Sequence, residues 1–271
     1  MMYLMTAMAA YLVGLSIGIC GVAGFLLPIF FVGYCGFPSS ASLFLSFGCF
    51  LISGAIGAWN YQKRGEMPLK PALTLGLSSL VGGALGAVIG RVYVSDHIKT
   101  VLYVVVLISG IMIFVQELIT RDKKADVNAG GCEKADASGS STAGSGKKAA
   151  APELAPSLLV PLGFVTALIC ALSGAGGPVM VMPLLVLLGM PVRTAVGVAL
   201  FDSVFIAIPA IIVYGSQTDI PAYISVMLIA FAAHAAGILT GSRLAAYIPP
   251  KPLKRGVAVF SIVFAIWRLF G

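Results

Sequence analysis

Six long apolar runs constrain the fold of this 271-residue chain more than any other feature. Each run has about 17 to 23 residues, close to the roughly 20 residues with which an α-helix crosses a bilayer. Charged residues make up only 10% of the chain and the mean hydropathy is +1.03, which excludes an ordinary soluble domain. We therefore predict an all-α integral membrane protein with plain spans at 39–59, 71–91, 98–120, 192–214, 222–242 and 254–270.

Two further apolar stretches, 3–35 and 157–190, are too long for one crossing, and glycines interrupt each of them near its middle. They resemble each other: "GVAGFLLPIFFVGYCGFP" in the first matches "GGPVMVMPLLVLLGMP" in the second, with Pro38 opposite Pro191. "GALGAVIGR" at 83–91 likewise resembles "GILTGSR" later in the chain. We predict an internal duplication in which each half is a broken or re-entrant helical hairpin followed by three transmembrane helices.

The predicted organisation has three parts. Residues 1–120 form the first transmembrane repeat and residues 157–271 form the second. Residues 121–156 join them, and their small, polar and charged side chains without apolar periodicity predict a flexible linker. The N-terminus has no basic region before its apolar segment, so we interpret it as part of the first repeat and not as a cleaved signal.

The distribution of Lys and Arg decides between two topologies. If each broken stretch crossed the membrane once, the 17 basic residues would be divided almost evenly between the two sides. If each is a hairpin that returns to its own side, one side holds all of them except Arg91, Lys99 and Arg268. Because cytoplasmic loops are enriched in Lys and Arg, the hairpin arrangement is favoured. It predicts a cytoplasmic linker, both termini in the periplasm, and two inverted repeats.

The glycine-rich interruptions are the predicted tips of the hairpins. At "LSGAGGPVMVMP" Pro178 can occupy the first helical position, so that the second arm, 178–188, begins near the membrane midplane. The free N–H groups and positive dipole end of a helix start bind anions. The alternative is that the glycines only allow close helix packing. We expect both tips to converge on one substrate site, with Gly21, Gly24, Gly174, Gly176 and Gly177 as its tip residues.

A glycine-rich break followed by a proline, "LLVLLGMP", "RTAVGVALF" and the turn "YQKRGEM" together resemble the sulfite exporter TauE/SafE family of bacterial transporters. The resemblance covers both halves but not the linker. It implies a transporter, not an enzyme, that moves a small sulfur-containing anion, such as sulfite, thiosulfate or an organosulfonate like sulfoacetate, across the inner membrane. The first tip, "GICGVAG", departs from the family's adjacent glycines, which the second tip retains as "GAGGP".

Asp202 lies about halfway along the span 192–214. A carboxyl group at membrane depth is costly, and it is therefore a functional hypothesis in itself. It could bind a coupling proton, or it could accept a structural hydrogen bond at a hairpin tip.

His234 is central in the span 222–242, where the sequence pairs it with Gly83. It could donate a hydrogen bond to a bound oxyanion, or it could pack against a neighbouring carbonyl. Ser46 and Ser173 could bind sulfonate oxygens, or they could bond to their own helix backbone. Arg91 and Arg243 end corresponding helices of the two repeats and could form a gate or funnel for an anion, although interfacial anchoring is the favoured reading.

The remaining features narrow the classes of function. The five cysteines have no metal-ligand spacing, so we expect no metal and no cofactor. The net charge of +7 follows from loop topology and indicates no nucleic-acid partner. The expected partners are the lipid bilayer, the sulfur-containing anion and protons as coupling ion, while the oligomeric state is left open.

We predict a secondary transporter that works by alternating access, with one repeat rocking against the other around a midplane site. Two alternatives remain at this stage. One is an anion channel of the same architecture. The other is an intramembrane serine protease with Ser173 as nucleophile and His234 as base.

Overall fold

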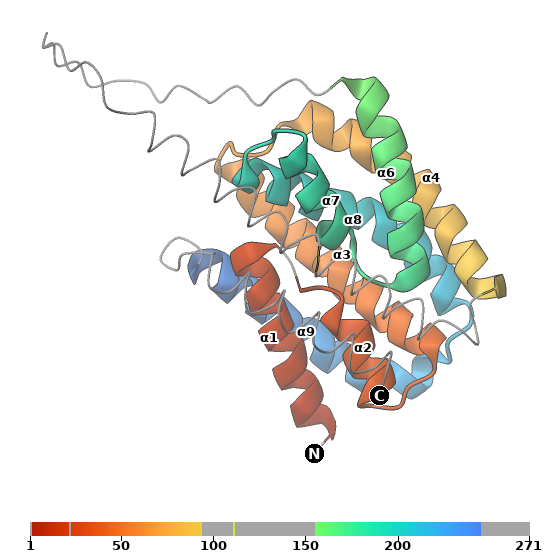
Figure 1. Cartoon of the computed structure of the whole chain (residues 1–271). Helices are drawn as coiled ribbons and strands as arrows, with labels where there is room; N and C mark the ends of the chain where they lie inside the picture. The colour runs from red at the N-terminus through yellow and green to blue at the C-terminus, as the bar shows by residue number, and fades with distance from the viewer. Residues whose placement is uncertain (1, 22, 94–110, 112–154, 245–271) are drawn as a thin grey trace, which may run out of the picture.

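A computed structural model describes residues 2–21, 23–93, 111 and 155–244 of the chain, and its helices are drawn in Figure 1. Every regular element in these residues is an α-helix. The helices of the first half are α1 (Met2–Cys20), α2 (Leu26–Gly33), α3 (Ser39–Lys63) and α4 (Leu69–Tyr93). Those of the second half are α6 (Pro156–Ser173), α7 (Gly177–Leu187), α8 (Val192–Gly215) and α9 (Ile220–Leu244).

The predicted all-α membrane fold is confirmed. Six of the helices, all except the short α2 and α7, are long and apolar enough to cross a membrane. Four of the predicted plain spans lie within α3, α4, α8 and α9, and the broken stretches are interrupted where the glycines predicted. The other two, at 98–120 and 254–270, lie outside the described residues apart from residue 111, and so does the linker except for residues 155 and 156.

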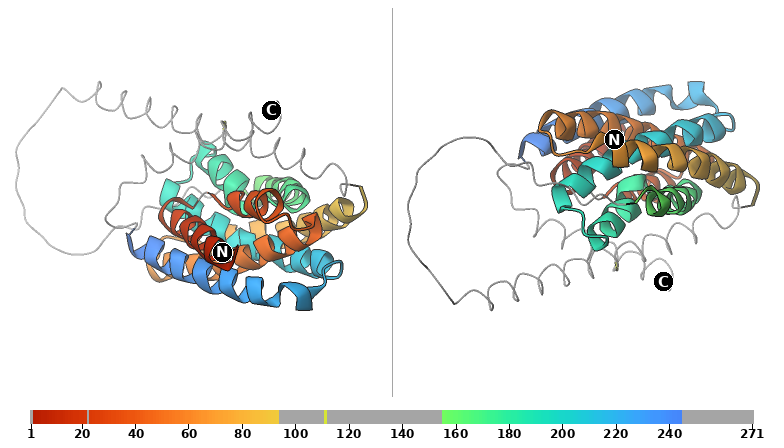
Figure 2. Two further views of the ribbon diagram at one scale, coloured as in Figure 1. Left: turned by 90° about the horizontal axis from the view of Figure 1, so that it is seen from below. Right: turned by 90° about the horizontal axis from the view of Figure 1, so that it is seen from above.

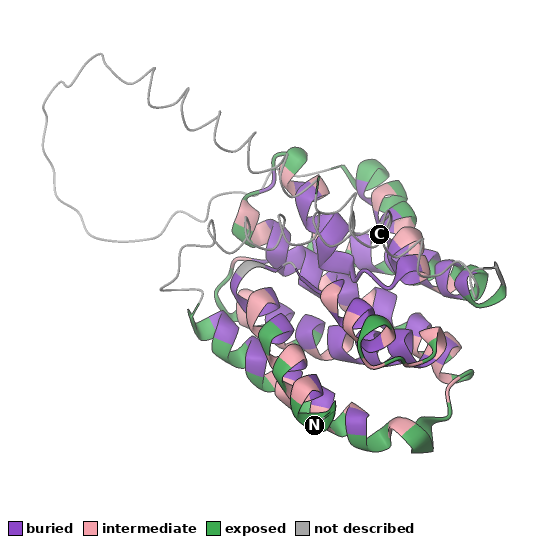
Figure 3. Ribbon diagram, turned by 60° about the horizontal axis from the view of Figure 1, so that its bottom comes forward, coloured by how far each residue is buried: buried purple, intermediate pink, exposed green. Residues whose placement is uncertain are grey.

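The helices α3 and α8 form the centre of the bundle. Every residue of α3 from Ala41 to Phe50 is buried. One flank is the pair α1 and α9 and the other is the pair α4 and α6 (Figures 1 and 2). Figure 3 shows the buried residues gathered at the centre and the exposed residues on the outer helices. Each flank pairs one helix from each half of the chain, so the two halves are interlocked.

Glycines allow the two helices of each flank to approach closely. At four glycines, an added Cβ atom would collide with a backbone carbonyl oxygen of the partner helix. Small residues at such spacing are typical of helix contacts in membranes. The hydrophobic effect does not drive helices together in lipid, so close van der Waals packing of the backbones stabilises the contact instead. The pairs are Gly82 with Phe164 and Gly86 with Leu168 in one flank, and Gly237 with Tyr11 and Gly241 with Leu15 in the other.

These contacts also correct the register between the halves. Gly82 and Gly237 occupy corresponding places in the two flanks. His234 lies three residues before Gly237, and Ser79 lies three residues before Gly82. The counterpart of His234 is therefore Ser79 and not Gly83. The contacts between helices, and not the local similarity of the two sequence segments, set this correspondence.

Two polar contacts place three parts of the chain at one end of the bundle. Arg193, in the first turn of α8, forms an ion pair with Glu66 of the α3–α4 loop at 3.2 Å. Arg64 donates a hydrogen bond to the carbonyl of Ser242, in the last turn of α9, at 3.2 Å. If each broken stretch crossed the membrane once, these partners would lie at opposite ends. The contacts support the hairpin arrangement, while the inverted relation of the halves stays a prediction.

A test of the flank packing is Gly237→Val. The added side chain has no room against the backbone of Tyr11, and over-packing of this kind costs about 1–3 kcal/mol. We expect a lower melting temperature and loss of monodisperse protein in detergent, measured by thermal unfolding and gel filtration. The control is Ala236→Val, one residue away on the exposed face of α9, which should leave both unchanged. Equal melting temperatures for the two variants would contradict the close contact.

Candidate functional site

The second hairpin tip is built by two glycines in the left-handed region. Gly174 (φ 70°) ends α6, and its N–H donates to the carbonyl of Cys170 at 2.8 Å. Gly176 (φ 77°) directly precedes α7, and residues other than glycine are strained in this conformation. Pro178 is the second residue of α7 and not the first, one position later than the sequence predicted.

Side chains of α6 satisfy part of the backbone at this tip. The Ser173 hydroxyl accepts a hydrogen bond from the Ala175 N–H at 3.3 Å and donates one to the Ile169 carbonyl at 2.8 Å. The Cys170 thiol donates to the Gly176 carbonyl at 3.4 Å. These bonds matter because irregular backbone at membrane depth must be satisfied within the protein. Ser173 thus has a structural role at the tip.

The two tips converge on the ring of Phe50. A Cβ atom at Gly24 would lie 2.8 Å from Cε1 of this ring, and one at Gly176 would lie 3.2 Å from its Cε2 and Cζ. Phe50 is buried and lies halfway along α3. The outer edge of the ring therefore lies against the glycines of both hairpins.

Further contacts show how deep each tip reaches. A Cβ at Gly177, the first residue of α7, would be 3.2 Å from the Cα of Ser203, which is halfway along α8. Gly174 contacts Leu43, and Gly21 would bring a Cβ to 2.6 Å from Val196. Leu43 and Val196 lie one turn into α3 and α8. The Ser203 contact places the start of α7 at the middle of the bundle, whereas the Leu43 and Val196 contacts place Gly174 and Gly21 nearer its ends.

Asp202 is fully buried next to this region. Its carboxyl group lies beside the Ser79 hydroxyl of α4, and the Cys170 thiol of α6 is in the same buried region. Neither carboxyl oxygen has a hydrogen-bond partner among the described residues. Both neighbouring groups donate their hydrogen elsewhere: the Ser79 hydroxyl to the Gly163 carbonyl at 3.1 Å, and the Cys170 thiol to the Gly176 carbonyl. A buried acid in such surroundings is costly unless a proton or cation joins it.

His234 is buried in the flank formed by α1 and α9. Its Nδ1–H donates to the Ala10 carbonyl at 3.1 Å, and its Nε2 has no partner within the part of the chain that the structure describes. Ser79 makes the corresponding bond to Gly163 in the other flank. His234 therefore makes the carbonyl contact that was one of its two predicted roles. The Ser46 hydroxyl likewise bonds to its own helix, donating to the Ser42 carbonyl at 2.7 Å.

Arg91 and Arg243 lie at opposite ends of the bundle. Arg91 follows Gly90, which contacts the Tyr214 hydroxyl near the end of α8. Arg243 follows Ser242, which Arg64 contacts at the end of α3. Both arginines are exposed, as expected for interfacial anchors or outer funnels and not for ligands at the tips.

The protease alternative has no geometric basis. Ser173 and His234 form no hydrogen bond with each other in the described residues, and each is bonded to backbone groups on its own flank. No cluster of three metal-ligating side chains occurs among residues that the structure describes.

Two residues of this region were missed in the sequence. Phe50 carries no polar signal, since it is one apolar residue within an apolar span. Ser79 could have been recognised only from the correct alignment of α4 with α9, in which it corresponds to His234.

Six candidate spans with two broken helices that meet at a buried centre define a multi-pass membrane protein of the kind that moves solutes, since broken helices at the midplane are typical of secondary transporters. The family comparison agrees. The chain belongs to the sulfite exporter TauE/SafE family, whose model matches residues 4–268. It is therefore a membrane transporter of a family that exports sulfite-type anions. Comparisons with curated proteins and with solved structures gave no match.

The tip geometry predicts that Gly176→Ala lowers transport more than it lowers stability. A side chain there is strained by φ 77° and also pushes against Phe50. Gly189→Ala is the matched control, because it has φ 93° but nothing within 4 Å of the added Cβ. Each variant should lose about 1–3 kcal/mol of stability from backbone strain. Uptake by membrane vesicles, corrected for protein content, should fall several-fold for Gly176→Ala alone. Equal transport by the two variants would contradict a role for the tip.

Proposed function

We propose that this protein is a secondary transporter that moves a small sulfur-containing anion by alternating access, with its site between the two hairpin tips. The convergence of Gly24 and Gly176 on Phe50, at the middle of the central helices, carries this proposal. Phe50 lies about halfway along α3, so this place is near the middle of the bundle. Alternating access needs such a site, because each side must reach it in turn.

The chemistry at the tips suits an anion. The helix α7 begins there, so its first N–H groups and its positive dipole end face the centre. The edge of the Phe50 ring carries partial positive charge and faces the same place. In a medium of low dielectric constant these contributions are stronger than in water. Asp202 lies next to this tip through Cys170, so we propose that it carries its proton while the anion is bound.

The orientation we propose is the one that the basic residues favour. The α3–α4 loop and the start of α8 share one end of the bundle. The start of α6, where the linker joins, lies at that end too, because Gly163 of α6 contacts Leu75 in the first two turns of α4. We place this end in the cytoplasm and the N-terminus in the periplasm of the bacterial inner membrane. The two halves would then be inverted repeats.

The packing changes which parts would move. Because α1 packs with α9 and α4 with α6, the sequence halves cannot separate as rigid bodies. We propose instead that the two flanks move relative to the central α3 and α8, alternately opening the tips to each side.

Asp202 is the proposed proton-coupling residue. It lies one residue from Ser203, which contacts the start of α7. Its carboxyl accepts no hydrogen bond among the described residues, because the neighbouring Ser79 hydroxyl donates to Gly163. Gain or loss of a proton therefore strongly changes the free energy of burying this carboxyl. A change of charge there can bias the arrangement of α8 against the tip.

The experiment that tests the function is uptake by purified protein in proteoliposomes. Sulfite, thiosulfate, sulfate, sulfoacetate and taurine are compared with and without a pH gradient. We expect selective uptake of one sulfur anion, accelerated by the gradient, with a fixed ratio of protons to substrate. Movement of several anions without a fixed ratio would indicate a channel and would contradict the carrier. Failure to move any of them would contradict the substrate class.

For coupling, we expect Asp202→Asn to abolish the effect of the gradient. A gradient of one pH unit drives about tenfold accumulation per coupled proton, and the variant should lose this accumulation. Exchange of labelled for unlabelled substrate at equal pH should persist, since the tips are intact. The control is Asp219→Asn in the exposed α8–α9 loop. Unchanged gradient-driven accumulation in Asp202→Asn would rule out the coupling role.

A further inference from the structure

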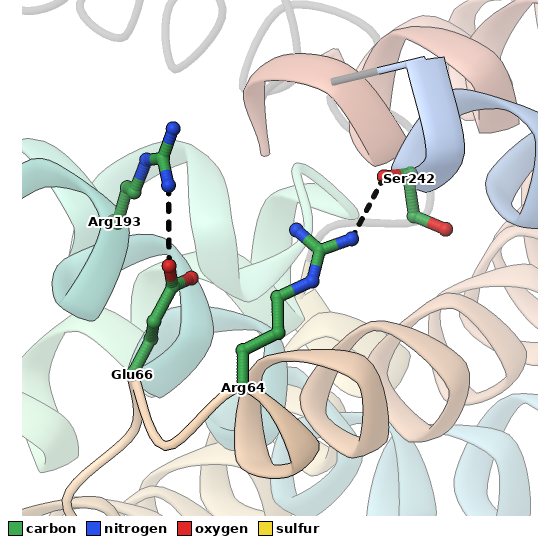
Figure 4. Close-up of polar contacts among 4 residues, drawn as sticks. All are labelled: Arg64, Glu66, Arg193 and Ser242. Carbon is green, nitrogen blue, oxygen red and sulfur yellow. Dashed lines mark hydrogen bonds and ion pairs between the residues drawn. The ribbon is translucent and has the colours of Figure 1, made fainter. Parts of the chain in front are cut away.

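Polar contacts tie the two halves of the chain together at one end of the bundle (Figure 4). The guanidinium of Arg193 lies 3.2 Å from Oε1 of Glu66, and that of Arg64 donates to the carbonyl of Ser242. Asn60 adds a hydrogen bond to the Ser242 hydroxyl at 3.2 Å. All three contacts join α3 or the α3–α4 loop to the start of α8 or the end of α9.

The opposite end has no equivalent ion pair in the part of the chain described. Pro38 and Pro191 precede α3 and α8 in the same way. In this register Arg193 corresponds to Ser40, which is uncharged. The two ends of the bundle are therefore chemically different.

The Glu66–Arg193 pair is suited to breaking and re-forming. The side chain of Arg193 is 72% exposed and that of Glu66 is 24% exposed. Only one carboxylate oxygen is bonded, while Oε2 of Glu66 is buried without a hydrogen-bond partner among the described residues. Exposed single-contact ion pairs contribute little to stability. A pair of this kind can stabilise the conformation in which this end is closed, and it is weak enough to break when the conformation changes.

The pair also lies on the route to the tips. The helix α7 runs from the centre of the bundle back to this end, where a short turn leads to Arg193 in α8. One turn further along α8, Gly197 packs against Tyr61 of α3. When Arg193 leaves Glu66, the α3–α4 loop, and with it the flank of α4 and α6, can move away from the start of α8. That movement opens the centre to this end.

We propose that the Glu66–Arg193 ion pair, with the Arg64–Ser242 hydrogen bond, forms a latch that keeps this end of the bundle closed while the opposite end is free to open. The latch rests on the proposed alternating access. While the latch is formed, the centre of the bundle is closed to the side on which Glu66 lies. The latch therefore favours the state that is open to the opposite side over the state that is open to the Glu66 side.

The test uses Cys170 as a reporter of opening. This cysteine is fully buried one turn before the tip. In the full chain, Cys20, Cys35, Cys49 and Cys132 are replaced by Ala, and inside-out vesicles are treated with a charged maleimide that does not cross membranes. Glu66→Gln should raise the labelling rate of Cys170 about two- to fivefold, as expected from the strength of a partly exposed ion pair. Arg193→Gln should do the same.

The exchanged pair, Glu66→Arg with Arg193→Glu, should return the rate towards that of the parent, which a merely misfolded protein would not do. Asp219→Asn is the matched control at the opposite end and should leave labelling unchanged. Unaltered labelling in both single variants, or labelling in the exchanged pair as fast as in Glu66→Gln, would overturn the latch. Labelling does not depend on transport, so faster labelling without uptake of any sulfur anion would support the latch and reject the proposed substrate.

Discussion

The need to satisfy every backbone polar group away from water governs this structure. Lipid offers no hydrogen-bond partner, so a helix can be interrupted within a membrane only where protein surrounds the break. The break between α6 and α7 meets this requirement because it lies against α3 and α8 and is bonded by Ser173 and Cys170. The burial of α3 from Ala41 to Phe50 follows from the same need, since both breaks must be covered.

The bundle combines firm and weak contacts in different places. The flanks are held by glycines against backbone carbonyls, and a packed contact of this kind has little freedom to change. The Glu66 end is held by one partly exposed ion pair and two hydrogen bonds to Ser242. A transporter needs both kinds of contact, because rigid bodies must keep their shape while the bonds between them break in every cycle. In the proposed mechanism the flanks would move as rigid bodies, and the contacts at the ends would break and re-form.

Much of the fold could be predicted from the sequence because membrane helices have a local signal. The spans that became α3, α4, α8 and α9 need only about 20 apolar residues, and the break at Gly174 and Gly176 needs only residues that end and restart a helix. Pro38 and Pro191 were paired from sequence alone, and each precedes its central helix in the structure. The central place of Asp202 was also visible in the sequence, because it is a lone acid among apolar residues, and the structure shows it buried.

The sequence by itself therefore determined the number and place of the breaks, the spans that the structure describes and the isolated acid, since all of these depend on neighbouring residues. Only the tertiary structure decided that the two tips meet on Phe50, that Asp202 faces Ser79 and that His234 corresponds to Ser79. It also brought Glu66 to Arg193. These contacts join residues far apart in the chain, and they depend on how helices from different halves interlock. No local pattern encodes that packing, because a lipid-facing and a protein-facing apolar residue look the same in a membrane sequence.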